Sequence, residues 1–178
     1  MQVVHWQAAD LRKRIDDAMT IYGAAMGYPR QVAMARAGTT TQHTRLPDFR
    51  AVAAISGRAL VGFGYGYRSA TGQWWHDQVA SAVPAETRTR WMTDCFELSE
   101  LHVEPGWQGR GIGRSLITTL LDPRPAAHVL LSTPEGPTRA LSLYRSIGFV
   151  DVLRGHLFPG DARPFAVLGL SIPTAADA

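Results

Sequence analysis

The residues best suited to chemistry form a glycine-rich turn, Gln108-Gly109-Arg110-Gly111-Ile112-Gly113, followed by Arg114 and Ser115. The glycines carry no side chain, so a ligand can approach the backbone closely. Apolar residues at helical spacing continue from Ile112 to Leu121, which indicates a helix that begins at the turn. The free N–H groups of a helix start favour an anion, and the two arginines add positive charge. The segment therefore predicts a pyrophosphate-binding site over residues 108–115.

Two common kinds of glycine-rich loop do not match this segment. The phosphate-binding loop G-x-x-x-x-G-K-[ST] requires a lysine, and Lys13 is the only lysine in the chain. The dinucleotide fingerprint G-x-G-x-x-G requires a third glycine where Arg114 stands. The pattern here is Q-x-x-G-x-G, so a nucleotide-dependent enzyme is disfavoured.

Two segments, in the right order, resemble the GCN5-related N-acetyltransferase (GNAT) family. The run from Glu97 to Leu116 is similar to its motif A, and Ala140–Phe149 fits its motif B, A-x-x-x-Y-x-x-x-G-F. Together the motifs span residues 97–149. The resemblance implies direct transfer of an acetyl group from acetyl-CoA, as co-substrate, to a primary amine of a small molecule or peptide. The alternative is a non-catalytic acyl-CoA-binding sensor or scaffold module.

One position departs from the family pattern. The family often places asparagine seven residues before the motif-B tyrosine, where this chain has Pro137. The cofactor contact is then lost, or is replaced by Thr138 or Arg139. A plainer interpretation is that Pro137 starts the helix.

The resemblance also implies roles for individual residues. The backbone of Leu101, His102 and Val103 is expected to hold the pantetheine arm and the thioester. Glu97 is the first candidate for the base and Glu100 the second. Strand alternation places these two glutamates on opposite faces unless a bulge intervenes, and a carboxylate at the edge of a cleft that binds a cationic substrate is the plainer interpretation. His102 can titrate near neutral pH, although a lone histidine beside a turn is more often structural.

Tyr144 is the candidate acid that protonates the departing thiolate, as the motif-B tyrosine does in the family. Its alternative is a core tyrosine on the apolar face of a helix.

The sequence defines the binding site of the acceptor amine less clearly than the cofactor site. Trp74 and Trp75 either stack on a substrate or cover the core. Acidic residues in the same region suit a cationic amine, including an aminoglycoside-like one, but are also ordinary in loops (Asp77, Glu86, Asp94). Cys95 is expected to be an ordinary buried thiol.

The elements that must position these residues can be predicted from periodicity and turn signals. We expect strands at 3–6, 51–56, 59–67, 96–103, 128–132, 149–157 and 165–170. We expect helices from an N-cap at Asp10 to Gly27, at 31–37, shortly after Pro84, from Ile112, and at 138–147, with loops at 38–44 and over most of 70–94. Gly62, Gly64 and Gly66 fall on one face of their strand, where a ligand approaches or a helix or bulge packs. The order predicts an α/β (α+β) fold, and the resemblance refines it to the acyl-CoA N-acyltransferase fold, a mixed sheet of six to seven strands flanked by about four helices.

Composition sets the outer limits. The chain has 178 residues, 46% of them hydrophobic, which suits one domain over 1–173 and a flexible tail at 174–178. No membrane span or signal peptide is evident, and a single cysteine excludes a disulfide framework, so we expect a cytoplasmic protein. The net charge of +3 is scattered, which argues against a nucleic-acid partner, and the chemistry needs no metal. The resemblance also allows a homodimer.

Overall fold

The computed structural model describes residues 1–173, and these form two compact units. The first unit contains Met1–Tyr67 and Leu98–Pro123, and the second contains Arg68–Glu97 and the chain from Arg124 onward. The expected flexible tail at 174–178 lies outside the described residues. None of the helices in the described part of the chain could span a bilayer.

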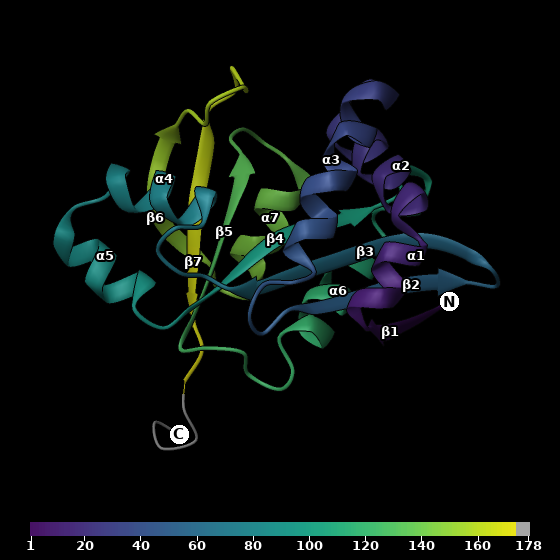
Figure 1. The fold of residues 1–178 in the computed structure, drawn as a ribbon, viewed down its shortest axis with the longest axis horizontal. Helices are drawn as coiled ribbons and strands as arrows, with labels where there is room; N and C mark the ends of the chain where they lie inside the picture. The colour runs from purple at the N-terminus through teal and green to yellow at the C-terminus, as the bar shows by residue number, and fades with distance from the viewer. Residues whose placement is uncertain (174–178) are drawn as a thin grey trace. The chain divides into compact units, whose positions relative to one another are not determined.

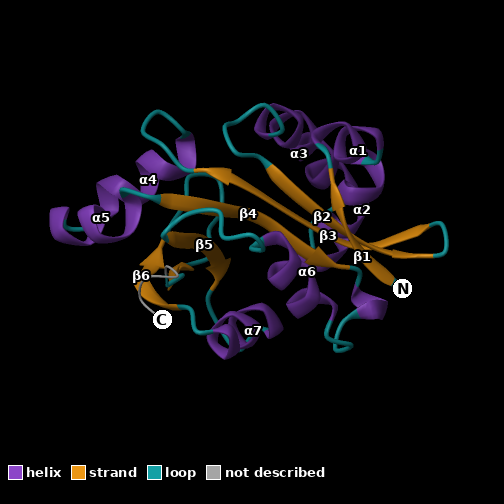
Figure 2. Ribbon diagram, turned by 90° about the horizontal axis from the view of Figure 1, so that it is seen from below, coloured by secondary structure: helices purple, strands orange, loops and turns teal. Residues whose placement is uncertain are grey.

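The first unit is built on an antiparallel sheet that carries helices on both faces. The strands β1 (Gln2–Trp6), β2 (Arg50–Ser56) and β3 (Ala59–Arg68) pair in sequence order, and the predicted β2–β3 hairpin turns at Gly57, where φ is +60°. Figure 2 shows α1, α2 and α3 over one face of these strands and α6 on the other. A core of apolar side chains lies between the sheet and α1–α2, and it includes Leu11, Met19 and Phe63.

The predicted first helix is two helices, α1 (Ala8–Lys13) and α2 (Ile15–Met26). The N-cap is Gln7 rather than Asp10, because Asp10 lies three residues into the helix and its carboxylate accepts a 2.8 Å hydrogen bond from the Gln7 amide. The left-handed Gly27 ends α2 as predicted.

The helix α3 (Arg30–His43) is twice as long as the sequence predicts, so the expected loop at 38–44 is wrong. Gly38 and three consecutive threonines are weak helix formers. Tertiary contacts overcome this weakness, because Thr40 is fully buried and its hydroxyl lies at hydrogen-bond distance from that of Tyr65.

The glycine face of β3 packs directly on protein. A Cβ at Gly62 would lie 3.0 Å from the His102 carbonyl oxygen and 3.2 Å from Leu116 of α6. A Cβ at Gly64 would lie 2.8 Å from Leu101. The interpretation of a strand packed beneath a helix is therefore confirmed at Gly62, and no ligand is required to explain either glycine.

The second unit has its own strand pairs. The start of β4 (Cys95–Val103) pairs in parallel with β5 (His128–Pro134), which pairs with the antiparallel β7 (Phe165–Ser171), and β7 pairs with β6 (Val150–His156). Its helices are α4 (Trp74–Ala82), α5 (Ala85–Met92) and α7 (Arg139–Ile147), labelled in Figure 1. The helix predicted after Pro84 is α5. The prediction of irregular chain before it is wrong, because residues 74–82 are helical and bury Trp75 and Val79.

The strand β4 belongs to both units, with residues 95–97 in the second and 98–103 in the first. The hydrogen-bonded strand order is β1-β2-β3-β4-β5-β7-β6, with parallel and antiparallel pairs. The mixed sheet of six to seven strands is confirmed. The described residues contain seven α-helices, compared with about four implied by the resemblance and five predicted by range. The two beyond those five arise because the first predicted helix is split and α4 was not foreseen.

Candidate active site

The glycine-rich turn joins the end of β4 to α6 (Ile112–Leu120) through a short 3-10 helix, η1 (Pro105–Trp107). Gly109 and Gly111 have φ of +77° and +79°, a conformation that favours glycine over any other residue. Gly111 is the N-cap of α6. The shape of the turn that leads into the helix therefore favours glycine at positions 109 and 111.

The start of α6 is open to a ligand. Its N-cap is a glycine, which has no side chain to bond the first amides, and a Cβ built at Gly111 would meet no atom within 4 Å. Four N–H groups at a helix start lack intrahelical partners, and the helix dipole favours an anion beside them. These features fit the diphosphate of a coenzyme A molecule.

The side chains of the turn contact the protein itself. Gln108 Nε2 donates a 3.0 Å hydrogen bond to the carbonyl of Val103, which ties the turn to the end of β4. The Arg110 guanidinium lies 5.0 Å from the centre of the Trp107 ring and donates to the Gly106 carbonyl. The turn is thus fixed by side chains, while its backbone is left facing outward.

Glu100 and His102 lie on the same face of β4, as strand alternation predicts, and are joined by a 2.6 Å contact between Glu100 Oε2 and His102 Nε2. Glu100 Oε1 accepts from Arg36 of α3, with Nε at 3.0 Å and Nη2 at 2.9 Å. The Glu100 side chain is only 6% exposed, so both oxygens are held in the interior. Burial by itself would raise the pKa of Glu100, but the Arg36 charge and the hydrogen bonds hold that pKa below its usual value.

Arg36 belongs to a polar stripe of α3 that sequence reasoning missed. Arg36, Thr40 and His43 recur every three to four residues, and the stripe reaches Tyr65 of β3 through a 3.1 Å contact to His43 Nδ1. Burial, with Arg36 nearby, lowers the pKa of His43 to about 4, and burial raises the pKa of Tyr65. The spacing is present in the sequence, but the prediction that the helix stops at residue 37 left Thr40 and His43 outside it.

Glu97 and Tyr144 belong to the second unit. Glu97 is 3% exposed and lies at the junction within β4, and burial together with Glu97 raises the pKa of the Cys95 thiol. Cys95 is therefore an ordinary buried thiol, as expected. Tyr144 is 6% exposed on α7, and its ring contacts Phe149 edge-on at 5.6 Å.

The helix α7 begins with a threonine cap. Thr138 is the N-cap, and its hydroxyl accepts a 3.1 Å hydrogen bond from the Leu141 amide. Pro137 precedes the cap, so it does not start the helix itself. Gly148 ends α7 in the left-handed conformation, as predicted.

The two adjacent tryptophans have different environments. Trp75 is buried, and its indole N–H donates a 3.0 Å hydrogen bond to Ser132, so it covers the core of the second unit. Trp74 is 54% exposed, with its ring 5.7 Å from that of Phe158. Trp75 is therefore a core residue, and substrate stacking by Trp74 stays a prediction.

The acidic residues of this region mostly serve the fold. Asp77 accepts from the Gly72 amide, and Asp94 accepts from the Ala127 amide and pairs with Arg68. The hydrogen bond from Ala127 is the main cause that lowers the pKa of Asp94. No group of residues within 1–173 has the composition and geometry of a metal site.

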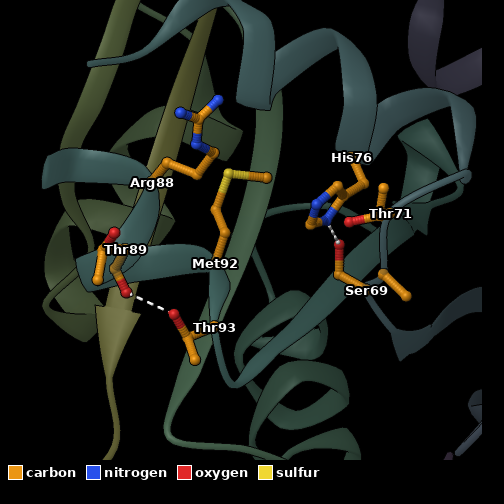
Figure 3. A pocket seen from close by; sticks show the side chains of 8 residues that line it. Ser69, Thr71, His76, Arg88, Thr89, Met92 and Thr93 are labelled. Atoms are coloured by element: carbon orange, nitrogen blue, oxygen red, sulfur yellow. Dashed lines mark hydrogen bonds between the residues drawn. The ribbon is translucent and has the colours of Figure 1, made fainter. Parts of the chain in front are cut away.

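An open hollow of about 410 Å³ lies beside α4 and α5 (Figure 3). Ser69 and His76 face each other on one wall, with 3.0 Å between Oγ and Nδ1. Thr71 lies beside this pair, and Arg88, Thr89 and Thr93 line the other side. Burial lowers the pKa of His76.

Comparison with known proteins defines the class. The model of the GNAT acetyltransferase domain matches residues 50–151. The GCN5-like protein acetyltransferase Rv2170 of Mycobacterium tuberculosis is 40% identical over 195 residues, which cover 93% of this chain and 95% of that protein. Among solved structures, yncA of Salmonella typhimurium with its cofactor acetyl-CoA has a TM-score of 0.64 at 15% identity, with 98% of both chains covered. An aminoglycoside 6′-acetyltransferase of type Ii has a TM-score of 0.67 at 18% identity, covering 98% of this chain and 99% of that one.

The chain belongs to the GNAT family of acetyltransferases. It is accordingly an acetyl-CoA-dependent acyltransferase, and transfer of an acetyl group to an amine is the general reaction of this family.

Proposed function

We propose that this chain moves the acetyl group of acetyl-CoA directly to a primary amine of a small molecule or peptide. The observation that carries the cofactor assignment is the start of α6, where the N-cap Gly111 has no side chain and faces open space. Residues 108–115 would bind the diphosphate, and the backbone of Leu101, His102 and Val103 would align the pantetheine arm along β4. The cofactor supplies an activated thioester, so the protein needs to position the amine and move protons.

Proton transfer would be divided between β4 and α7. Glu97, Glu100 or a group in contact with one of them would accept the proton of the incoming amine, and Tyr144 would protonate the departing thiolate. A primary amine is charged at neutral pH, and a buried carboxylate on β4 would favour its approach. The relative named as a protein acetyltransferase favours an amine carried by a protein over a small metabolite. A cytoplasmic location and a homodimer stay predictions.

The test measures free thiol release from acetyl-CoA with a panel of amines: a polyamine, an aminoglycoside, a lysine-containing peptide and a peptide with a free α-amine. We expect turnover with at least one of them, and we expect Tyr144→Phe to lower kcat by about 10²- to 10⁴-fold while acetyl-CoA binding is retained. Tight acetyl-CoA binding without turnover on any amine would instead favour a non-catalytic sensor.

The cofactor site has its own variant. Gly111→Val should abolish acetyl-CoA binding, measured by calorimetry, because a β-branched residue resists a φ of +79° and its side chain enters the space in front of α6. Gly57→Val is the matched control, since it changes a glycine with φ of +60° at the distant β2–β3 turn. Unchanged acetyl-CoA affinity in the Gly111 variant would refute the loop assignment.

A further inference from the structure

Both oxygens of Glu100 are already engaged by the protein, which leaves little acceptor capacity for a substrate proton. Arg36 occupies Oε1 through two nitrogens, and His102 occupies Oε2 at 2.6 Å. The lowered pKa of this carboxylate also makes it a weaker proton acceptor than a free glutamate. The surroundings of Glu100 therefore disfavour it as the group that accepts the amine proton directly.

The same contact fixes the protonation of His102. An ionised carboxylate can only accept, so Nε2 of His102 carries the hydrogen that lies between the two residues. In the neutral ring, Nδ1 then carries the lone pair. Within residues 1–173, Nδ1 makes no hydrogen bond to the protein, and it is not among the fully buried polar atoms that lack a partner. Nδ1 is thus a free acceptor that is open to a small polar group.

The ring is held by its neighbours. Its centre lies 5.1 Å from the ring of Tyr22 of α2, at 84°, and 5.6 Å from that of Phe63 of β3. The His102 side chain is 10% exposed. A carboxylate on one nitrogen and aromatic rings beside it are the arrangement that orients an imidazole for proton transfer.

We propose that His102 is the base of the acetyl transfer, that Glu100 orients it and stabilises its charged form, and that Arg36 is the positioning residue that keeps Glu100 ionised. This assignment rests on the proposed function. Nδ1 removes a proton from the ammonium group of the acceptor, giving a neutral amine and an imidazolium. The amine nitrogen bonds to the thioester carbon, the carbon–sulfur bond breaks, and the thiolate receives the amine's second proton. The imidazolium returns its proton to solvent.

The charged and titratable groups around the Glu100–His102 pair come from four elements. They are Tyr22 of α2, Arg36 and His43 of α3, Tyr65 of β3 and Glu100 of β4. Glu100 is in direct contact and should dominate. Arg36 acts on the ring through Glu100, whose ionised form it maintains.

The test is the pH dependence of kcat/KM with the panel amine that gives the highest turnover. His102→Gln should lower kcat by about 10²- to 10⁴-fold and remove the acidic limb, with acetyl-CoA affinity unchanged. Glu100→Gln should keep that limb and lower kcat, because a neutral neighbour no longer stabilises the imidazolium that forms during the transfer. Arg36→Met should lower kcat in the same way, because Glu100 is then no longer held in its ionised form, and Arg36→Lys should restore the wild-type profile. Exposed His5→Gln is the matched control and should change nothing.

Other outcomes overturn the assignment. Loss of the limb in Glu100→Gln, or in Glu97→Gln with a normal limb in His102→Gln, would make a glutamate the base. Nitrogen NMR of the labelled chain needs no substrate and should find the hydrogen on Nε2 of His102, and a hydrogen on Nδ1 at neutral pH would refute the proposal even if no amine is turned over. Absence of turnover with every amine, combined with hydrogen on Nε2, would count against the proposed function and leave this geometry supported.

Discussion

At the scale of single residues, the charged groups of the first unit are informative because they are buried in pairs. Isolated, buried Glu100 would be costly, and its contacts to Arg36 and His102 remove most of that cost. The sequence predicts that Glu100 and His102 share a face, since they are two residues apart on a strand. It cannot predict Arg36 as their partner, because 64 residues separate it from Glu100 and only the tertiary fold joins them.

His43 gives a prediction for stability. Its pKa falls from 6.5 to about 4 on folding, so the unfolded chain binds the proton more readily than the folded one. The stability that His43 contributes is therefore complete above about pH 6.5 and is lost progressively as the pH falls towards 4. Urea unfolding at pH 7.5 and 5.5 should give a smaller free energy of unfolding at the lower pH.

His43→Gln should reduce that difference, because glutamine does not titrate. Glu100 has a lowered pKa as well, but its contribution is lost only at pH values below the usual glutamate range, so it is present at both measurements. An identical pH dependence in wild type and variant would contradict the buried state of His43.

At the scale of elements, the outcome depends on which physical signal each segment carries. The helices α6 and α7 were predicted well, because apolar spacing agrees with a glycine at one end of each helix. The helix α3 was cut short, since its second half has low intrinsic propensity and is stabilised by buried contacts of Thr40 and His43. The break at Arg14 could not be predicted either, because the apolar spacing continues through it.

The N-cap of α7 gives a prediction at this scale. Thr138→Ala should lower the free energy of unfolding by about 0.5 to 2 kcal/mol, because the Leu141 amide loses its acceptor. Chemical denaturation measures this change, and Thr138→Ser should restore most of it. If stability were unchanged while acetyl-CoA affinity fell, Thr138 would contact the cofactor in place of the missing asparagine, which was the alternative role expected from the sequence.

At the scale of the whole molecule, the two compact units are joined through β4. Glu97 ends the part of β4 that pairs with β5, and Leu98 begins the part that belongs to the first unit. Loss of either unit would leave one half of a continuous strand without partners. We therefore propose that residues 1–173 behave as a single domain.

A single domain should unfold in one cooperative transition. Far-UV circular dichroism and tryptophan fluorescence should give coincident thermal curves, and the calorimetric and van't Hoff enthalpies should agree. A double variant with Trp6→Phe and Trp107→Phe keeps tryptophans only in the second unit, so its fluorescence follows that unit alone. A fluorescence midpoint that departs from the circular dichroism midpoint in this variant would mean that the units unfold separately.

The bare face of β3 bears on how inherited variation in this protein should be interpreted. A methyl group at Gly64 would meet Leu101 Cδ1 at 2.8 Å and the carbonyl oxygen of Glu100 at 3.2 Å, so the neighbouring backbone would have to move by a few tenths of an ångström. A glycine-to-alanine allele at this position changes neither charge nor polarity and would be classed as mild. We nevertheless expect the variant protein to fold and to turn over slowly, because the displaced backbone belongs to Glu100, whose carboxylate contacts His102.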